Sequence, residues 1–523
     1  MTSGHLAIID FEKSFKHLAL QSIVVHVFPL STKTMILLVN PKATSWRYRI
    51  PLSVLAIGAS LEGRYPYEIV DGNVDRKIFE TLPRLIKEKN IRYVGFTVMP
   101  GPQLMQAIRL SKMVREQFPT VKIIWGGYFA SLHTTVILHS DCADFVIRDQ
   151  GDYSFRQLID ALEDGGSLSS VKGLSFDHGT IQHNEKQELI DPNQLPALPY
   201  HKVHLPPYIG RTYVGTRTIN YHSSVGCPFL CGFCAVAAVY KARWLGLAPE
   251  KIVADLLWFK REHGVNAVEF HDNNFFTSEK RTREFAERIN GHEISWWGEA
   301  RPDTMLNYSD STWRLMKQAG CKMIFFGAES SSQKVLDLME KGGTQTPDTV
   351  LDLADRMKGY SIVPEFSFVL GSPTETMEQD LERDIQYIKR IKEISSESEI
   401  IIYVYSPVHF EESELYHSAQ THGFAYPKTL DEWLLPEWQL HDLRKNPVTP
   451  WLTPKVLTRI KDFERVLHAR YPTNADLRLR KVQRTILKSL GTWRYKLSIY
   501  FAPYEIAVAQ RMFRYRQPEV EGF

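Results

Sequence analysis

Three of the five cysteines of this chain fall within eight positions, in the stretch GCPFLCGFC. Cys227, Cys231 and Cys234 have the spacing C-x3-C-x2-C. A closed zinc site takes four Cys or His ligands, and no fourth Cys or His follows here at ligand spacing. Three thiolates can instead bind three irons of a cubane iron–sulfur cluster and leave the fourth iron open to a small molecule. The pattern therefore favours a cluster with an open iron over zinc.

The other two cysteines, Cys142 and Cys321, lie in apolar, strand-like contexts and are predicted to be buried core thiols. An odd number of cysteines in 523 residues does not make a disulfide framework and indicates a reducing compartment, so we expect a cytoplasmic protein. The N-terminal residues do not have the pattern of an export signal. The longest apolar stretch near the C-terminus, LSIYFAPYEIAVA, is shorter than the roughly 20 residues that a spanning helix needs.

The cysteine loop follows the first strand of a regular series between residues 217 and 420. Apolar strands alternate there with amphipathic helices, which predicts a partial (β/α)6 barrel of the TIM type. The six expected strands lie in TRTINYHSSV, VNAVEFHDNN, ISWWGEARPD, CKMIFFGAES, IVPEFSFVLGSP and EIIIYVYSPV. Polar residues recur just after each strand, where barrel enzymes carry their chemistry.

A second series of strands and helices occupies residues 34–165 and begins with the apolar run MILLVN. Five strands alternate with helices, which predicts an α/β domain with a doubly wound parallel, Rossmann-like sheet. Ligands of such sheets lie beyond the carboxyl ends of the strands. The loops at those ends are rich in Gly, Pro, Asn and Asp: NPKAT, DGNVD, TVMPGP, GGYFAS and DQGD.

The remaining segments are an N-terminal extension (1–33), a polar, Pro-rich linker (166–216) and a mainly helical C-terminal domain (421–523). The last of these is basic, with 18 Lys and Arg against 10 Asp and Glu. Between Arg478 and Arg516 ten basic residues stand against one acid, interleaved with aromatic residues. This composition suits peripheral contact with an anionic membrane surface, and it equally suits a solvated basic face packed on the barrel.

The cysteine loop, with the aromatic Phe233 just before the last cysteine, resembles the signature of the radical S-adenosylmethionine (SAM) superfamily. The resemblance implies a 4Fe–4S cluster on the three cysteines, SAM at its open iron, and an external reductant such as flavodoxin or ferredoxin. It also implies a set of SAM contacts: Phe233, Asp272, Glu299, Arg301 and Glu329. Carboxylates and arginines at strand ends also serve as capping or ion-pairing groups, and a lone His such as His271 is more often structural. The sequence singles out no catalytic acid or base.

The first domain, taken with the barrel, resembles the cobalamin-binding (class B) radical SAM enzymes. That family includes C-methyltransferases and the anaerobic Mg-protoporphyrin monomethyl ester cyclase. The resemblance implies cobalamin contacts at Asn40, Pro41, Asp71, Asn73, Thr97, Gly126, Gly127, Gly151 and Asp152. The D-x-H-x-x-G pattern that supplies a lower axial histidine in other cobalamin proteins is absent, because Asn73 stands where that His would be. We therefore expect cobalamin without a histidine ligand below the cobalt.

The resemblance predicts a radical SAM enzyme that methylates an unactivated carbon of a bulky, apolar small molecule such as a lipid, terpenoid, pigment or natural product. Oxidative ring closure of the Mg-protoporphyrin monomethyl ester type is the alternative within the family. A non-catalytic cobalamin or iron–sulfur sensor that binds nucleic acid is the alternative of another class. The sequence disfavours nucleic acid, because it contains no helix-turn-helix, zinc-finger or RNP pattern.

Overall fold

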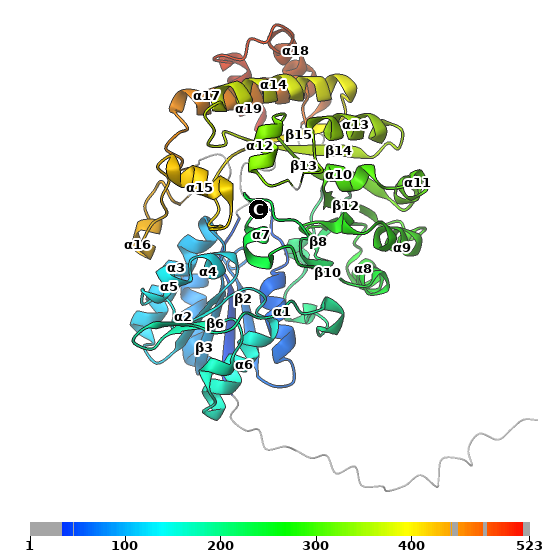
Figure 1. Cartoon of the computed structure of the whole chain (residues 1–523). Coiled ribbons are helices and arrows are strands. Elements are labelled where there is room, and N and C mark those ends of the chain that lie inside the picture. The colour runs from blue at the N-terminus through cyan, green and yellow to red at the C-terminus, as the bar shows by residue number, and fades with distance from the viewer. Residues whose placement is uncertain are drawn as a thin grey trace, which may run out of the picture.

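The structure is a computed structural model that describes residues 34–44, 47–341, 343–439, 441, 448–473 and 479–515. The extension predicted at residues 1–33 lies outside the described residues. A sheet domain, a partial barrel and a group of C-terminal helices follow one another along the long axis of the molecule (Figure 1). No described helix combines the length and the apolar character needed to cross a membrane.

The first domain is built on a seven-stranded sheet of order β2-β1-β3-β4-β5-β6-β7. Its first five strands run parallel, as predicted. The strands are β1 (Met35–Asn40), β2 (Tyr67–Asp71), β3 (Ile91–Thr97), β4 (Lys122–Gly126), β5 (Phe145–Ile147), β6 (Leu174–Asp177) and β7 (Ile181–His183). The interior strand β1 reads as a continuous apolar run because both faces of the sheet are covered by helices.

Two helices cover each face of this sheet. Helices α1 (Leu52–Leu61) and α6 (Asp152–Asp164) pack on one face, and α2 (Ile78–Lys89) and α3 (Pro102–Gln117) pack on the other. The short helices α4 (Tyr128–Leu132) and α5 (Thr134–Leu138) follow β4. The chain runs from β1 into α1 on one face of the sheet and from β3 into α3 on the other face. Because β1 and β3 are neighbours in the sheet, their carboxyl ends lie next to each other.

The structure differs from the sequence-based expectation within the segment predicted as a linker. Residues 174–183 form the antiparallel hairpin β6–β7, which pairs with β5 and extends the sheet. Short 3-10 turns at Pro192–Gln194, Tyr200–Lys202 and Pro206–Tyr208 then lead to the barrel. The hairpin is short and only half apolar, so its two strands give little periodic signal.

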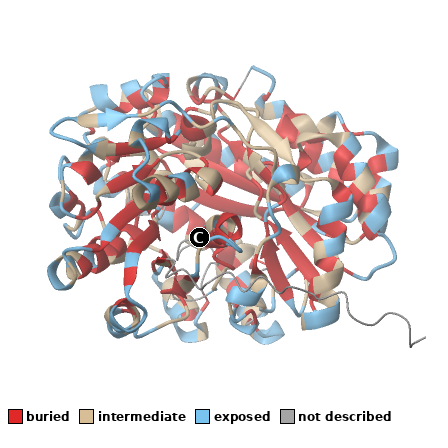
Figure 2. Ribbon diagram, turned by 90° about the horizontal axis from the view of Figure 1, so that it is seen from below, coloured by how far each residue is buried: buried red, intermediate tan, exposed pale blue. Residues whose placement is uncertain are grey.

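The second domain has the predicted partial barrel, with six parallel strands of order β15-β14-β13-β12-β11-β8. They are β8 (Thr218–Tyr221), β11 (Ala267–Phe270), β12 (Ser295–Ala300), β13 (Cys321–Glu329), β14 (Val363–Leu370) and β15 (Glu399–Val404). The helices between them are α7 (Ala235–Tyr240), α8 (Pro249–His263), α9 (Glu279–Ile289), α10 (Pro302–Leu306), α11 (Asp310–Gln318), α12 (Gln333–Leu338), α13 (Pro347–Lys358) and α14 (Met377–Ile394). Buried strands run through the middle of the molecule and exposed helix faces surround them (Figure 2).

The C-terminal part is helical, as predicted, and it binds the two domains together. Helices α15 (Glu414–Thr421) and α16 (Leu430–Trp433) contribute Leu415 and Trp433 to the core on the α2–α3 side of the first sheet. Helices α17 (Pro454–Arg470), α18 (Lys481–Lys496) and α19 (Tyr504–Phe513) pack their inner faces into the barrel core.

Candidate cofactor-binding and active site

A cavity of about 1630 Å³ lies between the carboxyl ends of the first sheet and the interior of the barrel. Thr97 and Gly127 line it from the sheet domain, Cys234 from the cysteine loop, and Glu299 and Tyr403 from barrel strands. The cavity therefore joins all three regions in which the sequence places chemistry. Its volume exceeds the roughly 300–1,000 Å³ of ordinary small-molecule sites.

The cysteine loop is held at both ends by a small antiparallel pair of strands, β9 (Ser224–Gly226) and β10 (Trp244–Gly246). Gly226 has φ +76°, and a Cβ at this position would lie 2.1 Å from the carbonyl oxygen of Arg243. No other residue type fits between the two strands at this point. In the middle of the loop, the Gly232 amide donates to the Met339 carbonyl at 3.0 Å, and Ser413 Oγ donates to the Gly232 carbonyl at 3.1 Å.

Cys227, Cys231 and Cys234 are all half-buried and free of disulfides, whereas Cys142 and Cys321 are buried core thiols, as predicted. Across the described part of the chain, no three His, Cys, Asp or Glu side chains converge on a point where they could hold one metal ion. A zinc ion needs all its thiolates within about 2.3 Å of one centre, while a cluster takes one thiolate at each of three separate irons. The loop therefore has the three-thiolate donor set that suits a cluster.

Arg301 lies against the cysteine loop. Its Nη1 is 3.5 Å from Sγ of Cys231, and its guanidinium carbon lies 3.9 Å from the centroid of the Phe229 ring. The other edge of the guanidinium donates to both carboxylate oxygens of Asp303, at 3.0 and 2.9 Å. Arg301 thus supplies a buried, rigidly held positive charge next to a thiol. It does not line the cavity.

Phe233 and Glu329, two of the predicted SAM contacts, both line the cavity. Glu329 has φ +67° at the irregular end of β13, and its Oε1 lies 3.1 Å from Nζ of Lys341 in a buried ion pair. A Cβ at Gly327 would lie 2.1 Å from that Oε1, so the preceding glycine makes room for the carboxylate. The Lys341 ammonium also lies 5.7 Å from the Phe233 ring centroid. Sequence reasoning did not identify Lys341, which follows a helix rather than a strand.

Asp272 is placed differently from its predicted role. Its carboxylate is fully buried and accepts hydrogen bonds from the Ser223 amide at 3.0 Å and from the hydroxyls of Ser223 and Ser224. It does not line the cavity, whereas the next residue, Asn273, does. Asp272 therefore fixes the chain between β8 and β9, just before the cysteine loop.

Most residues of the predicted cobalamin set line the cavity: Asn40, Asn73, Thr97, Gly126, Gly127, Gly151 and Asp152. Pro41 and Asp71 do not. The Asp71 carboxylate is buried and accepts from Asn40 Nδ2 at 2.9 Å and from the Tyr208 hydroxyl at 2.7 Å. Asp71 thus supports the neighbouring strand end instead of facing a ligand.

Asn73, which stands in place of the absent histidine, holds the loop after β1. Its Oδ1 accepts from the amides of Ala43 and Thr44 at 2.9 and 3.0 Å. Gly127 has φ +98°, and a Cβ there would lie 2.8 Å from the Val98 carbonyl. These loops present backbone and short side chains toward the cavity, which leaves a broad floor for a flat ligand.

The cavity also extends into the first domain, between the sheet and helices α1 and α6. The residues that line it there are apolar: Leu38, Val54, Ala59, Gly95, Ile124 and Phe155. A cavity of this volume, with glycines at the strand ends and an apolar extension into the first domain, has room and suitable walls for cobalamin, so the residues present fit that cofactor.

A charged group of side chains faces the cavity from the barrel interior, where such barrels usually have apolar layers. His271 lies between two carboxylates, with Nε2 3.5 Å from Glu269 Oε2 and Nδ1 3.8 Å from Glu299 Oε1. Burial by itself raises the pKa of Glu269, but Arg47 and His271 outweigh it and lower that pKa to about 2. Burial lowers the pKa of His222 to about 3, so this ring is neutral at pH 7.

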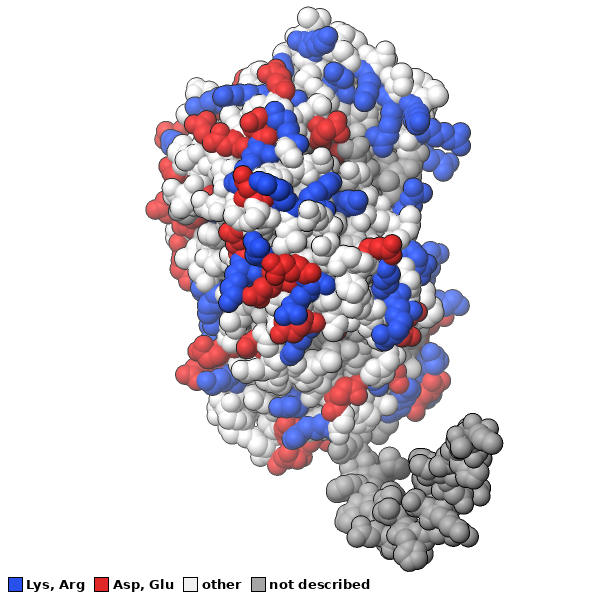
Figure 3. Space-filling model, turned by 90° about the vertical axis from the view of Figure 1, so that its right-hand side faces the viewer, with Lys and Arg blue, Asp and Glu red and all other residues white. Residues whose placement is uncertain are grey.

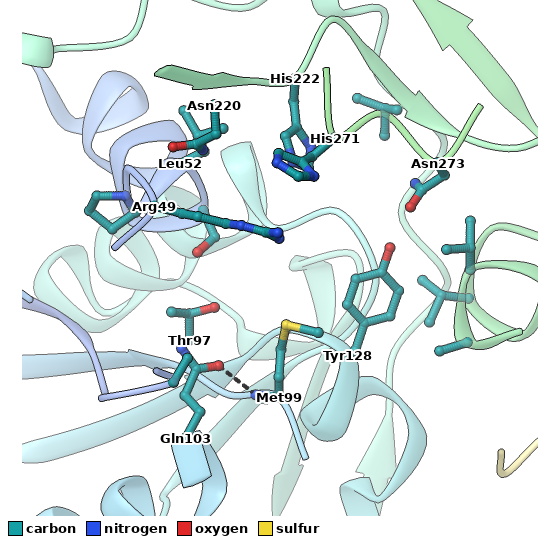
Figure 4. A pocket seen from close by; sticks show the side chains of 18 of the residues that line it. Arg49, Leu52, Thr97, Met99, Gln103, Tyr128, Asn220, His222, His271 and Asn273 are labelled. Carbon is teal, nitrogen blue, oxygen red and sulfur yellow. Dashed lines mark hydrogen bonds between the residues drawn. The ribbon is translucent and has the colours of Figure 1, made fainter. Parts of the chain in front are cut away.

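Arg49 reaches from the loop before α1 into the middle of this cavity. Figure 4 shows its side chain between the barrel residues His222 and His271 on one side and Thr97 and Met99 on the other. Burial lowers the pKa of Arg49 to about 10, which leaves it charged at neutral pH. Neither Arg49 nor His222 carries a sequence signal, because each lies in a loop without a motif.

His133 is also part of the cavity wall. Its ring lies 4.7 Å from that of Phe129, 5.2 Å from that of His409 and 5.2 Å from that of Trp433, measured between centroids. Burial lowers its pKa well below the usual value, with His409 and His441 adding to the effect. It is therefore a neutral ring held in an aromatic group.

Comparison with known families agrees with this arrangement. The profile of the radical SAM superfamily matches residues 221–388, and that of the B12 binding domain matches residues 47–159. The chain therefore contains a radical SAM domain and a B12 binding domain. Its cofactors are a 4Fe–4S cluster, SAM and cobalamin.

Curated relatives of this enzyme differ in activity. An uncharacterized methyltransferase of Pyrococcus horikoshii is 27% identical over 367 residues, which cover 68% of this chain and 78% of the relative. The anaerobic magnesium-protoporphyrin IX monomethyl ester cyclase of Synechocystis is 29% identical over 244 residues, 46% of this chain and 48% of the cyclase. The hopanoid C-3 methylase of Methylococcus capsulatus is 26% identical over 240 residues, 45% of each chain.

Among solved structures, the cobalamin-dependent SAM radical enzyme OxsB, with aqua-cobalamin and SAM bound, superposes with a TM-score of 0.68. The match covers 92% of this enzyme and 75% of OxsB at 15% identity, so it supports the fold and not the reaction. The two matched domains and the relatives named as methyltransferases identify this chain as an enzyme rather than a non-catalytic sensor.

Proposed function

We propose that this enzyme methylates an unactivated carbon of a bulky, mainly apolar small molecule. The observation that carries the proposal is the single cavity that connects the cysteine loop, the cobalamin-type floor and the barrel interior. When bound, the cluster and SAM supply a carbon-centred radical and cobalamin supplies a methyl group. Methyl transfer to a carbon radical needs both sources to reach one substrate, and a continuous space lets them do so.

The proposed substrate has an apolar body and one polar end. Trp297, Phe325 and Ile401 give the barrel part of the cavity apolar walls, which suit a lipid, terpenoid or pigment skeleton. The His271–Glu299 pair offers hydrogen bonds to a polar end, since the Glu299 side chain keeps a quarter of its surface exposed within the cavity. A fixed polar contact would orient the apolar body and select which carbon is methylated.

Labelled SAM tests the reaction. Anaerobically reconstituted enzyme, a flavodoxin or ferredoxin reductant, and methyl-deuterated SAM are incubated with total lipid and pigment extract of the source organism. Methylation predicts a product heavier by one labelled methyl group, with S-adenosylhomocysteine and 5′-deoxyadenosine in near-equal amounts. An unlabelled, hydrogen-depleted product, with 5′-deoxyadenosine and little S-adenosylhomocysteine, would instead establish the oxidative cyclase reaction suggested by the Synechocystis relative.

Glu299 variants separate a substrate contact from the SAM contact that the sequence predicts. If Glu299 holds the polar end of the substrate, Glu299→Gln lowers product formation at least tenfold and leaves SAM cleavage without substrate unchanged. If product formation and SAM cleavage without substrate both fall, Glu299 contacts SAM. Glu293→Gln, at an exposed carboxylate before β12, is the matched control.

We also propose that the enzyme works in the reducing cytoplasm, where the cysteines of the cluster loop stay free of disulfides. The remaining predicted SAM contacts, Phe233, Arg301 and Glu329, stay as proposals. Phe233 and Glu329 are supported by their position in the cavity wall, and Arg301 by its contact with Cys231.

A further inference from the structure

The C-terminal helices expose an unusual amount of apolar surface. Of the fourteen large apolar side chains that are exposed in the described part of the chain, nine lie between residues 482 and 512. They are Val482, Ile486, Trp493, Leu497, Ile499, Phe501, Tyr504, Val508 and Met512. Scattered apolar residues on a surface are ordinary, but such a concentration marks an interaction surface. We call these nine residues the apolar patch.

The apolar patch is the outer side of two helices whose inner sides are already packed. On α19, Tyr504, Val508 and Met512 recur every four residues and are 75%, 58% and 72% exposed, while Ile506 is fully buried. On α18, Leu487 and Tyr495 face the barrel core, and Phe501 in the following turn is 82% exposed. The outer apolar side chains therefore do not contribute to the packed core. We infer that they bind a partner of the enzyme.

Positive charge surrounds the apolar patch. Lys481, Lys488, Lys496, Arg511 and Arg514 are exposed on the same two helices and their ends. The single acid between residues 479 and 515 is Glu505, and Arg494 pairs with both of its oxygens. Figure 3 shows Lys and Arg side chains gathered among uncharged atoms at the upper end of the molecule, where α18 lies.

We propose that α18 and α19 dock the enzyme on an anionic lipid bilayer, with the apolar patch in the interface and the Lys and Arg side chains at the headgroups. Apolar and aromatic rings flanked by cations, on helices that lie flat, are the pattern of interfacial membrane binding. Nucleic acid would be held by the charges but would leave Val508 and Met512 without a partner.

The cavity comes close to this surface. Arg514 follows the last turn of α19, two residues after Met512, and its side chain lines the cavity. A bilayer-dissolved substrate would therefore meet the enzyme beside the cavity. This route for the substrate rests on the proposed function, in which the substrate is apolar. The docking itself is independent of the substrate and can be tested without any turnover.

Flotation of the full-length protein with vesicles tests the docking. We expect binding to vesicles of phosphatidylcholine with about one third phosphatidylserine, and at least tenfold weaker binding to phosphatidylcholine alone, because the cations add attraction to the anionic headgroups. The variant Phe501→Ser/Val508→Ser/Met512→Ser should lose at least tenfold in affinity and keep its iron content and unfolding midpoint. The matched control, Phe79→Ser/Leu435→Ser, removes two exposed apolar residues elsewhere and should bind as well as the parent.

Four results would overturn the proposal. Equal flotation with both kinds of vesicle rejects docking on an anionic surface, and equal flotation of the patch variant and its parent rejects docking through the apolar patch. Salt-sensitive binding to random RNA or DNA that the triple Ser variant retains, without vesicle binding, assigns the surface to nucleic acid. A dimer in sedimentation that the triple Ser variant converts to a monomer, without vesicle binding, makes the apolar patch a contact between two copies of the chain.

Discussion

The guanidinium Nη1 of Arg301 lies 3.5 Å from Sγ of Cys231. If Cys231 ligates the cluster as predicted, a positive charge so near it favours the more negative, reduced state of the cluster. Arg301→Gln should therefore retain iron but shift the cluster to a more negative reduction potential and slow SAM cleavage about tenfold or more. Anaerobic potentiometry followed by electron paramagnetic resonance measures the shift. Arg301→Lys, which keeps the positive charge, should restore part of the parent reduction potential. An unchanged potential in Arg301→Gln would contradict an electrostatic effect of Arg301 on the cluster.

The three loop cysteines should each be necessary for the cluster. Cys227→Ala, Cys231→Ala and Cys234→Ala remove one thiolate each, and iron and sulfide analysis after anaerobic reconstitution should show loss of the cluster. Cys142→Ala and Cys321→Ala are the controls, because both thiols are buried away from the loop and should leave iron content intact. Full iron content in the triple loop variant would rule out the cluster site.

Cobalamin should bind without a histidine below the cobalt, because Asn73 occupies the place of that ligand and His133 is packed among aromatic rings. The Co(II) form should lack nitrogen superhyperfine splitting in its paramagnetic resonance spectrum. If splitting appears, this prediction is wrong and His133 is the suspected ligand. His133→Ala should then remove the splitting, and His201→Ala, at an exposed ring, should not.

The stability of the protein should fall as pH drops below about 6.5. The pKa of His222 is lowered to about 3 by burial and by nearby His271 and Arg49, so the unfolded state binds a proton that the folded state does not. Each pH unit between about 6.5 and 3 then costs about 1.4 kcal/mol of unfolding free energy per such group. Urea unfolding of cluster-free protein at pH 7 and pH 5 measures this slope.

His222→Gln should make the slope shallower, because glutamine takes up no proton in either state. His201→Gln is the control, since the His201 side chain is two-thirds exposed. His441, whose pKa burial lowers to about 4, should leave a residual slope in the His222 variant. An identical slope in parent and His222→Gln would contradict this account.

Asn73→Ala should weaken cobalamin binding and destabilise the first domain by about 1–3 kcal/mol, because it removes the acceptor of the half-buried Ala43 amide and of the buried Thr44 amide. Cobalamin retained after gel filtration and thermal unfolding report the two effects. Gln182→Ala, at an exposed position on β7, should change neither.

Much of the fold could be predicted from the sequence because buried parallel strands read as continuous apolar runs, and β1 and β15 are examples. The cysteine loop could be identified as a cluster motif because few other kinds of site have three cysteines with the spacing C-x3-C-x2-C. The direction of polar side chains at strand ends could not be predicted, because the alternation of side chains between two faces stops where the strand ends. Asp272 bonds to Ser223 before the cysteine loop, whereas its neighbour Asn273 faces the cavity. Arg49, His222 and Lys341 reach the site from loops. Only the tertiary fold determines which loop side chains lie close together there.

The sequence also shows that residues 478–516 are basic and aromatic, but not which side of each helix those residues occupy. Tyr495 and Trp493 illustrate the limit, because they lie two positions apart and one is buried while the other is exposed. Helical periodicity alone cannot assign the inner face when both faces are apolar.

The antiparallel pairing of β9 with β10, in which Gly226 faces Trp244, ties together the two ends of the segment that carries Cys227, Cys231 and Cys234, the predicted cluster ligands. Most of the conformational freedom of that segment is thus removed by the fold itself rather than by the metal. Iron lost to oxygen should then leave an empty but correctly shaped loop. Repair in the cell would consist of reinserting iron and sulfide into a folded protein, with no need for resynthesis or refolding.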